Sequence, residues 1–251
     1  MKNKLSLLFT VAIMSAVITT EAQNSGRVVY EEKAKLNINI DSENQEMLNS
    51  LPKEHIVSKE LIFDTNASIF QEIVKSNSDD ELTKESGHGR MVIKMDSPNS
   101  HIYCDLVEKK RVEQRDFMSR TFLIEVPFSA SVWKLTGKQK TILNYTCQEA
   151  VLQDTARKLT AWFTSEIPVS TGPNGVCNLP GLVLGAEMNG GEISFDAKSI
   201  KLEPVDHKLI VKPTEGKKVT REEFNKIVAE KTREMGEQGD GNGNVIIRIK
   251  K

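Results

Sequence analysis

An alternation of apolar and polar residues near the start of the chain constrains its fold more than any other feature. From residue 27 to residue 40 nearly every second position is apolar, and only Glu32 breaks the apolar side of the pattern. Most of the intervening positions carry charged or amide side chains. A period of two residues is typical of a β-strand with one buried face, and polar residues on the other face favour antiparallel pairing. The chain is therefore expected to build a sheet with one covered face.

Shorter stretches with β-strand character recur along the rest of the chain. They predict strands in or near residues 57–69, 91–95, 101–107, 112–117, 122–128, 131–135, 140–149, 158–165, 182–188, 192–195 and 201–203. Residues 76–90 are polar and glycine-containing, which predicts a loop. Many short strands separated by turn signals are typical of antiparallel β folds. We predict a mainly β protein, an antiparallel meander that forms a curved sheet or half-barrel.

One helix is expected near the end of the chain. Thr220 and Glu223 have the spacing of a capping box, in which each side chain accepts a hydrogen bond from the backbone N–H of the other residue. Apolar residues then recur at helical spacing, and Gly236 is a typical stop. The sequence predicts a helix over about 220–236, a Gly/Asn linker over 236–244 and a terminal strand over 245–250.

The first 22 residues have the order of an export signal. Lys2 and Lys4 precede an almost wholly apolar run from residue 5 to residue 18, and Ala22 offers a small residue for cleavage. The alternative, a membrane anchor, needs about 20 apolar residues, more than this run provides. We expect residues 1–22 to be removed and residues 23–251 to form one domain, secreted or periplasmic, with no remaining transmembrane segment. The first cysteine is Cys104, so a lipoprotein is not expected.

The near equality of basic and acidic residues limits the kinds of partner that the protein is expected to bind. The formal net charge is −1, with 34 basic and 35 acidic residues. Such a balance provides no field to neutralise phosphates and no polybasic patch for membranes. Nucleic acid is therefore not an expected partner.

Export also bears on the three cysteines, because disulfides persist in oxidising compartments. Cys104, Cys147 and Cys177 allow one bridge between two of them and leave one free thiol. The alternative is that all three are buried thiols that pack as small hydrophobic residues.

No catalytic, cofactor-binding or metal-binding motif is found. His55, His88, His101 and His207 lack metal-ligand spacing. Met91 and Met95 could suggest copper capture, but four residues along a strand span about 13 Å, so the two cannot share one ion. We expect no catalytic residues, no metal ligands and no cofactor.

A segment in the middle of the chain carries a recognisable signature. Residues 158–187 contain an AWFT strand, an EIP turn, a GP pair and the run LPGLVL, and Trp133, residues 140–150 and residues 220–224 add to the pattern. The chain resembles the GLPGLI family, which is found in Bacteroidetes-type bacteria and has no settled biochemical activity. Asn178 stands where the family has the first glycine, and Cys177 where an aromatic residue is usual.

The signature itself can be interpreted in two ways. Its prolines fix the backbone and cannot donate to a sheet, and Pro180-Gly181 has the composition of a type II turn, which predicts a structural corner leading into a buried strand at 182–184. The alternative is a binding surface. The residues concerned are Trp162, Pro168, Gly172, Pro173, Leu179, Pro180, Gly181 and Leu182.

These observations predict an exported envelope protein that is not an enzyme. A curved sheet with an apolar concave face could bind a hydrophobic, lipid-like ligand or a partner protein. The alternatives are a protein that handles copper or zinc, and a hydrolase whose site the sequence does not reveal.

Overall fold

The computed structural model of the chain describes residues 24–35, 52–73, 81–86, 89–95, 100–128, 132–153, 158–236 and 245–249. The predicted signal peptide and most of the predicted Gly/Asn linker lie outside these residues. None of the helices in the described ranges has the length and apolar character needed to cross a membrane.

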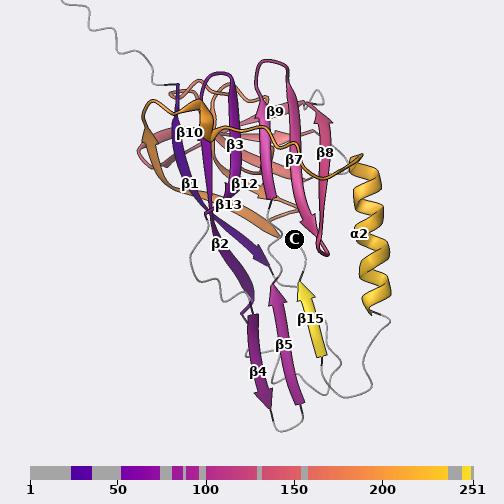
Figure 1. The fold of residues 1–251 in the computed structure, drawn as a ribbon. Coiled ribbons are helices and arrows are strands. Elements are labelled where there is room, and N and C mark those ends of the chain that lie inside the picture. Colours follow the sequence, from indigo (N-terminus) through magenta and orange to yellow (C-terminus); the bar gives the residue numbers. More distant parts are fainter. Residues whose placement is uncertain are drawn as a thin grey trace, which may run out of the picture.

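Most of the described chain is β-strand (Figure 1). The strands are β1 (Gly26–Lys35), β2 (Glu54–Phe63), β3 (Ala67–Glu72), β4 (Glu81–Ser86), β5 (Gly89–Met95), β6 (Ser100–Asp105), β7 (Lys110–Phe117), β8 (Arg120–Pro127), β9 (Trp133–Ile142), β10 (Tyr145–Leu152), β11 (Leu159–Thr164), β12 (Leu182–Met188), β13 (Ile193–Leu202), β14 (Lys217–Val219) and β15 (Val245–Ile249). The helices among the described residues are α2 (Arg221–Gly236) and two short 3₁₀ turns, η2 (Pro173–Gly175) and η3 (His207–Leu209).

Twelve strands form one open sheet in the order β14-β8-β7-β6-β3-β2-β1-β13-β12-β11-β10-β9. Two runs of sequential antiparallel strands, β6–β8 and β9–β13, are joined through β1, β2 and β3, and β1 pairs with both β2 and β13. Within this sheet only β14 pairs in parallel, with β8, and in the separate three-stranded sheet β15 pairs in parallel with β5. The predicted mainly β, antiparallel fold is confirmed.

The large sheet curves strongly around one segment of the chain. Trp133 on β9, the last strand of the sheet, donates to the carbonyl oxygen of Cys177. Arg111 on β7, close to the opposite edge, donates to the carbonyl oxygen of Gly175. Because Gly175 and Cys177 are two residues apart, both ends of the sheet must approach the same short segment. The curvature predicted from the sequence is therefore present.

Two further elements lie outside this curved sheet. The strands β4, β5 and β15 form a separate three-stranded sheet that projects from the large one, and α2 lies beside β8 (Figure 1). The helix begins as predicted, because Glu223 N–H donates to the Thr220 hydroxyl while Thr220 N–H donates to the Glu223 carboxylate. Phe224 then packs edge-on against Phe117 and Phe122.

Several predicted elements differ from the structure. The single strand region expected at 57–69 is two strands, β2 and β3, which pair antiparallel across a turn. The expected strand at 140–149 is interrupted by a turn at Leu143 and Asn144, which both have positive φ and connect β9 to β10. The expected loop at 76–90 contains β4, since polar composition does not prevent a strand from pairing with its neighbour. The two strands expected at 192–195 and 201–203 are one continuous strand, β13, because pairing with β1 extends through the polar residues between them.

The main hydrophobic core lies inside the curve. Tyr30, Phe70 and Phe195 form a chain of edge-to-face aromatic contacts, with ring centroids 6.0 and 5.9 Å apart. Alternate residues of β1 are buried, as the period of two residues requires. The apolar side of the first predicted strand is therefore the concave face of the sheet.

Candidate functional site

The concave face is filled by the part of the chain that connects β11 to β12. We call residues 165–181 the plug segment. Its buried residues include Ile167, Val169, Thr171, Val176, Cys177 and Leu179. These side chains belong to, or lie beside, the same core as the inner faces of β1, β2, β6 and β12. The apolar interior that could have held a ligand is therefore occupied by the protein itself.

Backbone hydrogen bonds fix the plug segment against the start of β12. Leu182 N–H donates to Ile167 O at 2.9 Å, and Val183 N–H donates to Thr171 O at 2.9 Å. The Thr171 hydroxyl also lies 2.7 Å from the hydroxyl of Ser68 on β3, and both residues are buried. Buried polar groups need such partners, and here they tie the segment to two parts of the sheet.

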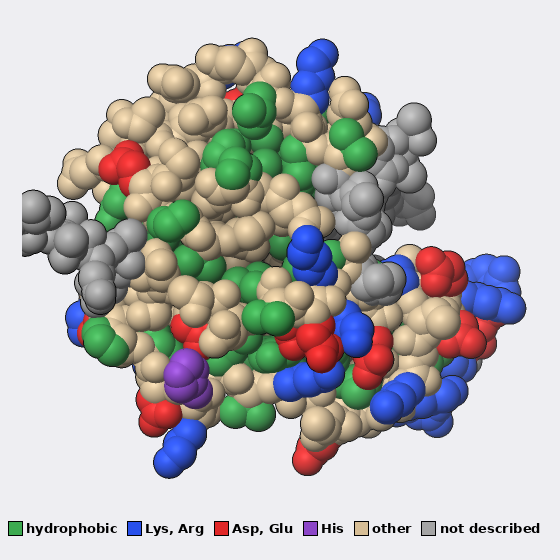
Figure 2. All heavy atoms as spheres, turned by 90° about the horizontal axis from the view of Figure 1, so that it is seen from above, with side chains coloured by type: hydrophobic (Ala, Val, Ile, Leu, Met, Phe, Trp, Pro, Cys, Tyr) green, Lys and Arg blue, Asp and Glu red, His purple; other side chains and the backbone are tan. Residues whose placement is uncertain are grey.

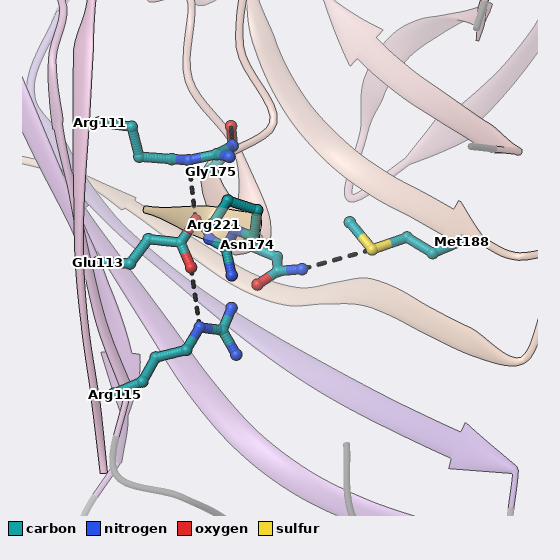
Figure 3. Close-up of polar contacts among 7 residues, drawn as sticks. All are labelled: Arg111, Glu113, Arg115, Asn174, Gly175, Met188 and Arg221. Carbon is teal, nitrogen blue, oxygen red and sulfur yellow. Dashed lines mark hydrogen bonds and ion pairs between the residues drawn. The ribbon is translucent and has the colours of Figure 1, made fainter. Parts of the chain in front are cut away.

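One face of β7 carries the most concentrated charge in the interior, next to the tip of the plug segment (Figure 3). Glu113 is 2% exposed, and three arginines surround it. Arg115 Nε donates to Glu113 Oε2 at 2.8 Å. Arg111 Nε lies 3.0 Å from Oε1, as an ion pair without hydrogen-bond geometry, and Arg221 at the start of α2 contacts Oε1 as well. The cluster thereby joins β7, the plug segment and α2.

The arginines determine the protonation of Glu113. Burial raises the pKa of this carboxyl, but the guanidinium groups of Arg115, Arg111 and Arg221 outweigh burial and lower the pKa to about 2. Glu113 is therefore ionised at neutral pH. Removing its charge would leave three guanidinium groups facing one another.

A second group of buried charges lies on the first three strands. Lys59 Nζ is 3.5 Å from Glu32 Oε2 and 3.5 Å from Glu72 Oε2, and the Lys59 side chain is 5% exposed. Glu32 is the residue that interrupts the apolar side of the first strand, and its burial explains that exception. An acidic residue on an apolar strand face was thus a usable sign of a buried ion pair.

The signature residues lie in and around the plug segment, and they divide by exposure. Gly172, Pro173, Leu179, Gly181 and Leu182 are buried, Pro168 and Pro180 are exposed, and Trp162 is half-buried. On β11 the Trp162 ring carries the Lys140 ammonium at 4.2 Å from its centroid. Trp133 instead contacts the plug segment, through its hydrogen bond to the carbonyl oxygen of Cys177.

The predicted type II turn at Pro180-Gly181 has a different form. Gly181 does have positive φ, at 157°, but its own N–H donates to Leu179 O, which closes a three-residue turn around Pro180. Gly181 also passes so close to β11 that a Cβ atom there would overlap the carbonyl oxygen of Thr164. The predicted buried strand at 182–184 is confirmed, since all three residues are fully buried.

The three cysteines are free thiols in the structure, and all are buried. Burial raises the pKa of Cys104 to about 12 and the pKa values of Cys147 and Cys177 to about 11. Thiols held protonated in this way are poor nucleophiles at neutral pH. The arrangement corresponds to the alternative in which cysteines pack as small hydrophobic residues.

The histidines do not assemble a metal site with the other described residues. Groups of three or more potential metal-ligating side chains are absent from the described part of the chain. His207 Nδ1 lies 2.8 Å from Asp64 Oδ2, and Asp64 in turn accepts from the backbone N–H groups of Asn66 and Ala67. This pair ties η3 to the turn between β2 and β3. His88 lies outside the described residues, as do the side chains of Met91 and Met95.

The arginine cluster was not anticipated from the sequence. The spacing Arg111-x-Glu113-x-Arg115 shows that the three side chains share one strand face, but charged residues at alternate positions usually face solvent. The plug segment and α2, both distant in sequence, cover this face. Only knowledge of those contacts could have distinguished a buried cluster from an exposed one.

Comparison with known families finds one match, which covers the plug segment. Residues 153–185 match a family described as protein of unknown function (Porph_ging). The matched region contains β11, all of the plug segment and the start of β12. No curated protein sequence matches the chain.

The fold is shared with solved structures of PNGF-II. Two crystal forms of that protein superpose with TM-scores of 0.53 and 0.51, at 14% and 13% sequence identity. The matches cover 82% of this chain but only 34% and 33% of the PNGF-II chain. The chain thus spans about a third of the length of the structure it matches, and the likeness concerns the fold alone.

Proposed function

We propose that this protein is an exported, non-enzymatic member of the GLPGLI family that binds a partner protein. The supporting observation is the plug segment, which occupies the concave face where a hydrophobic ligand would have been held. A lipid-like ligand would have to displace buried residues such as Ile167 and Leu179 from the core. A partner that binds the outside of the sheet requires no such displacement.

Export rests on the first 22 residues, with their basic start and apolar run. We propose a secreted or periplasmic location with cleavage before Gln23. Expression of the full chain in a Bacteroidetes-type host, followed by fractionation and N-terminal sequencing, tests this proposal. An uncleaved product in the membrane fraction would contradict it.

The surface that best fits a partner protein is the edge of β9 that pairs with no other described strand. This strand is the last in the sheet, and all of its residues from Lys134 to Thr141 are exposed. Ten residues of edge strand span about 33 Å, enough to pair with an extended segment of another protein. Leu135 is 52% exposed, and Val132, immediately before the strand, is 58% exposed. Figure 2, a view onto one end of the molecule, shows hydrophobic side chains at the surface away from the charged side where α2 lies.

The charge of this edge indicates the chemistry of the partner. Lys134, Lys138 and Lys140 all lie on β9, and within the described chain only Lys138 forms an ion pair, with Glu149. Lysines on an edge strand also discourage self-association. Both effects favour an acidic extended segment over a second copy of the same basic edge.

The experiment has two arms, one for a bound hydrophobic ligand and one for a partner protein. Native mass spectrometry of the mature protein, purified without detergent, is expected to give the mass of the bare chain. A stoichiometric lipid adduct would overturn the choice of a partner protein over a hydrophobic ligand.

The second arm tests the edge of β9 directly. A photo-crosslinking residue at position 135, placed in the exported protein, is expected to capture a partner that the same residue at the exposed position 209 does not. Lys134→Glu should then weaken binding of that partner about tenfold, whereas Lys208→Glu, at an exposed lysine in η3, should not. Equal changes in partner affinity in Lys134→Glu and Lys208→Glu would show that β9 is not the binding surface.

A further inference from the structure

The arginine cluster around Glu113 holds more positive charge than the described residues neutralise. Three guanidinium groups, those of Arg111, Arg115 and Arg221, share a single carboxylate. Neither Arg115 nor Arg221 contacts a second carboxylate among the described residues. The cluster therefore has an excess of two positive charges in a partly covered position.

The arginines also have hydrogen-bond donors to spare. Each guanidinium group has five N–H donors, and Glu113 offers only two oxygen atoms to three such groups. Arg115 uses its Nε on Glu113, and Arg221 uses one terminal nitrogen. In the view of Figure 3 the guanidinium groups of Arg115 and Arg221 lie on the same side of Glu113 as Asn174, at the tip of the plug segment.

The position of the cluster leaves these donors within reach of a small solute. The side chains of Arg115 and Arg221 are 21% and 28% exposed, whereas that of Glu113 is 3% exposed. Ser100 on β6 is the register partner of Arg115, and it adds a nearby hydroxyl group. The strands and α2 hold the groups in place before any ligand arrives, which lowers the entropic cost of binding.

We propose that Arg115 and Arg221 bind an oxyanion, as a phosphate, sulfate or carboxylate group, beside the Glu113 carboxylate that already pairs with both guanidinium groups. The planar fork of arginine fits such groups through two parallel hydrogen bonds. The excess charge makes the cluster an anion site and distinguishes it from an ordinary structural ion pair. This inference does not depend on the proposed partner-protein function.

The test measures binding of inorganic phosphate to the mature protein at constant ionic strength, with chloride as the replaced anion. Isothermal calorimetry and the thermal midpoint are both followed, with sulfate and acetate as parallel probes to separate tetrahedral from planar anions. Wild-type protein is expected to bind at least one of these anions at one site. Arg115→Gln should weaken that binding about tenfold, through the loss of a charge-assisted hydrogen bond.

Two further variants keep the test decisive. Arg120→Gln, at the exposed arginine that begins β8, should bind the anion as wild type does. Glu113→Gln removes the carboxylate that competes for the guanidinium groups, so it should bind the anion about tenfold more tightly and gain more thermal stability from it.

Several results would overturn the proposal. One is the absence of binding by wild type and by Glu113→Gln for all three anions. Another is equal anion affinity in Arg115→Gln and Arg120→Gln, which would indicate a general salt effect. Should Arg115→Gln fail to fold, Arg115→Lys, which keeps the charge but loses the fork, is expected to weaken binding about tenfold, and unchanged affinity in that variant would also contradict the site.

Discussion

The hydroxyl of Tyr30 on β1 donates a 2.6 Å hydrogen bond to the carbonyl oxygen of Val183 on β12, entirely inside the core. Val183 N–H in turn donates to Thr171 of the plug segment. One buried side chain thus connects the first strand to the backbone that holds the plug segment in place.

Tyr30→Phe should therefore destabilise the protein beyond the loss of one ordinary hydrogen bond. The Val183 carbonyl would lose its tyrosine donor in a fully buried site, which costs about 1–3 kcal/mol. Urea unfolding followed by circular dichroism measures the change. Tyr145→Phe, at a half-buried position on β10, is the matched control and should cost less than about 0.5 kcal/mol. Equal costs for the two variants would show that the Tyr30 hydrogen bond does not stabilise the core.

The pH dependence of stability should reveal the charge on Glu113. Its pKa is about 2 in the folded protein, below its ordinary value of 4.5, so the ionised form stabilises the fold. This contribution, about 3 kcal/mol, is present above pH 5 and is lost as the pH falls toward 2. The unfolding free energy of wild type should exceed that of Glu113→Gln at pH 7, and the difference should shrink below pH 5. A difference that does not change between pH 7 and pH 3 would contradict the buried ion cluster.

Gly181 is expected to be among the least replaceable residues of the chain. A Cβ atom there would overlap the Thr164 carbonyl, and the backbone φ of 157° disfavours other residues. Gly181→Ala should cost more than about 4 kcal/mol or prevent folding. Gly137→Ala provides the contrast, because Gly137 has φ of 82° but no atom within 4 Å of its Cβ position, and this change should cost about 1–2 kcal/mol. Similar yields and stabilities for both variants would show that the close approach to β11 is not required.

Trp133 should control how firmly the plug segment is held. Trp133→Phe removes the 3.1 Å hydrogen bond to Cys177 O and about 1 kcal/mol with it. Local opening should then become about five times more frequent, and thiol labelling at Cys177, located by mass spectrometry, should accelerate by the same factor. Trp162→Phe keeps the Trp133 bond and should leave the labelling rate unchanged. An equal labelling rate of Cys177 in wild type and in Trp133→Phe would show that Trp133 does not hold the plug segment in place.

Features of the fold that depend on residues close together in the sequence could be predicted. The cap of α2 was predictable, because Thr220 and Glu223 satisfy each other within one turn. The strands β5, β6, β7, β12 and β15 were predicted to within a few residues, because alternation and composition are local properties. The turn at Leu143 was missed, because an apolar residue with positive φ carries no turn signal.

The contents of the candidate site could not be predicted from local pattern alone. Alternation places Arg111 and Glu113 on one face of a strand, but it does not say what covers that face. The cover comes from Gly175 and Arg221, which lie 64 and about 110 residues further along the chain. The signature was identified as a structural corner or a binding surface. Its filling of the concave face depends on contacts with strands at both ends of the sheet.

Hydrogen–deuterium exchange of the plug segment tests the account most directly. If residues 165–181 are part of the core, the amides of Leu182, Val183 and Thr171 should exchange as slowly as those in the centre of β1 and β13. Exchange of these amides at the rate of an open loop, with β1 and β13 still protected, would contradict the account and return the concave face to the role of a ligand cavity.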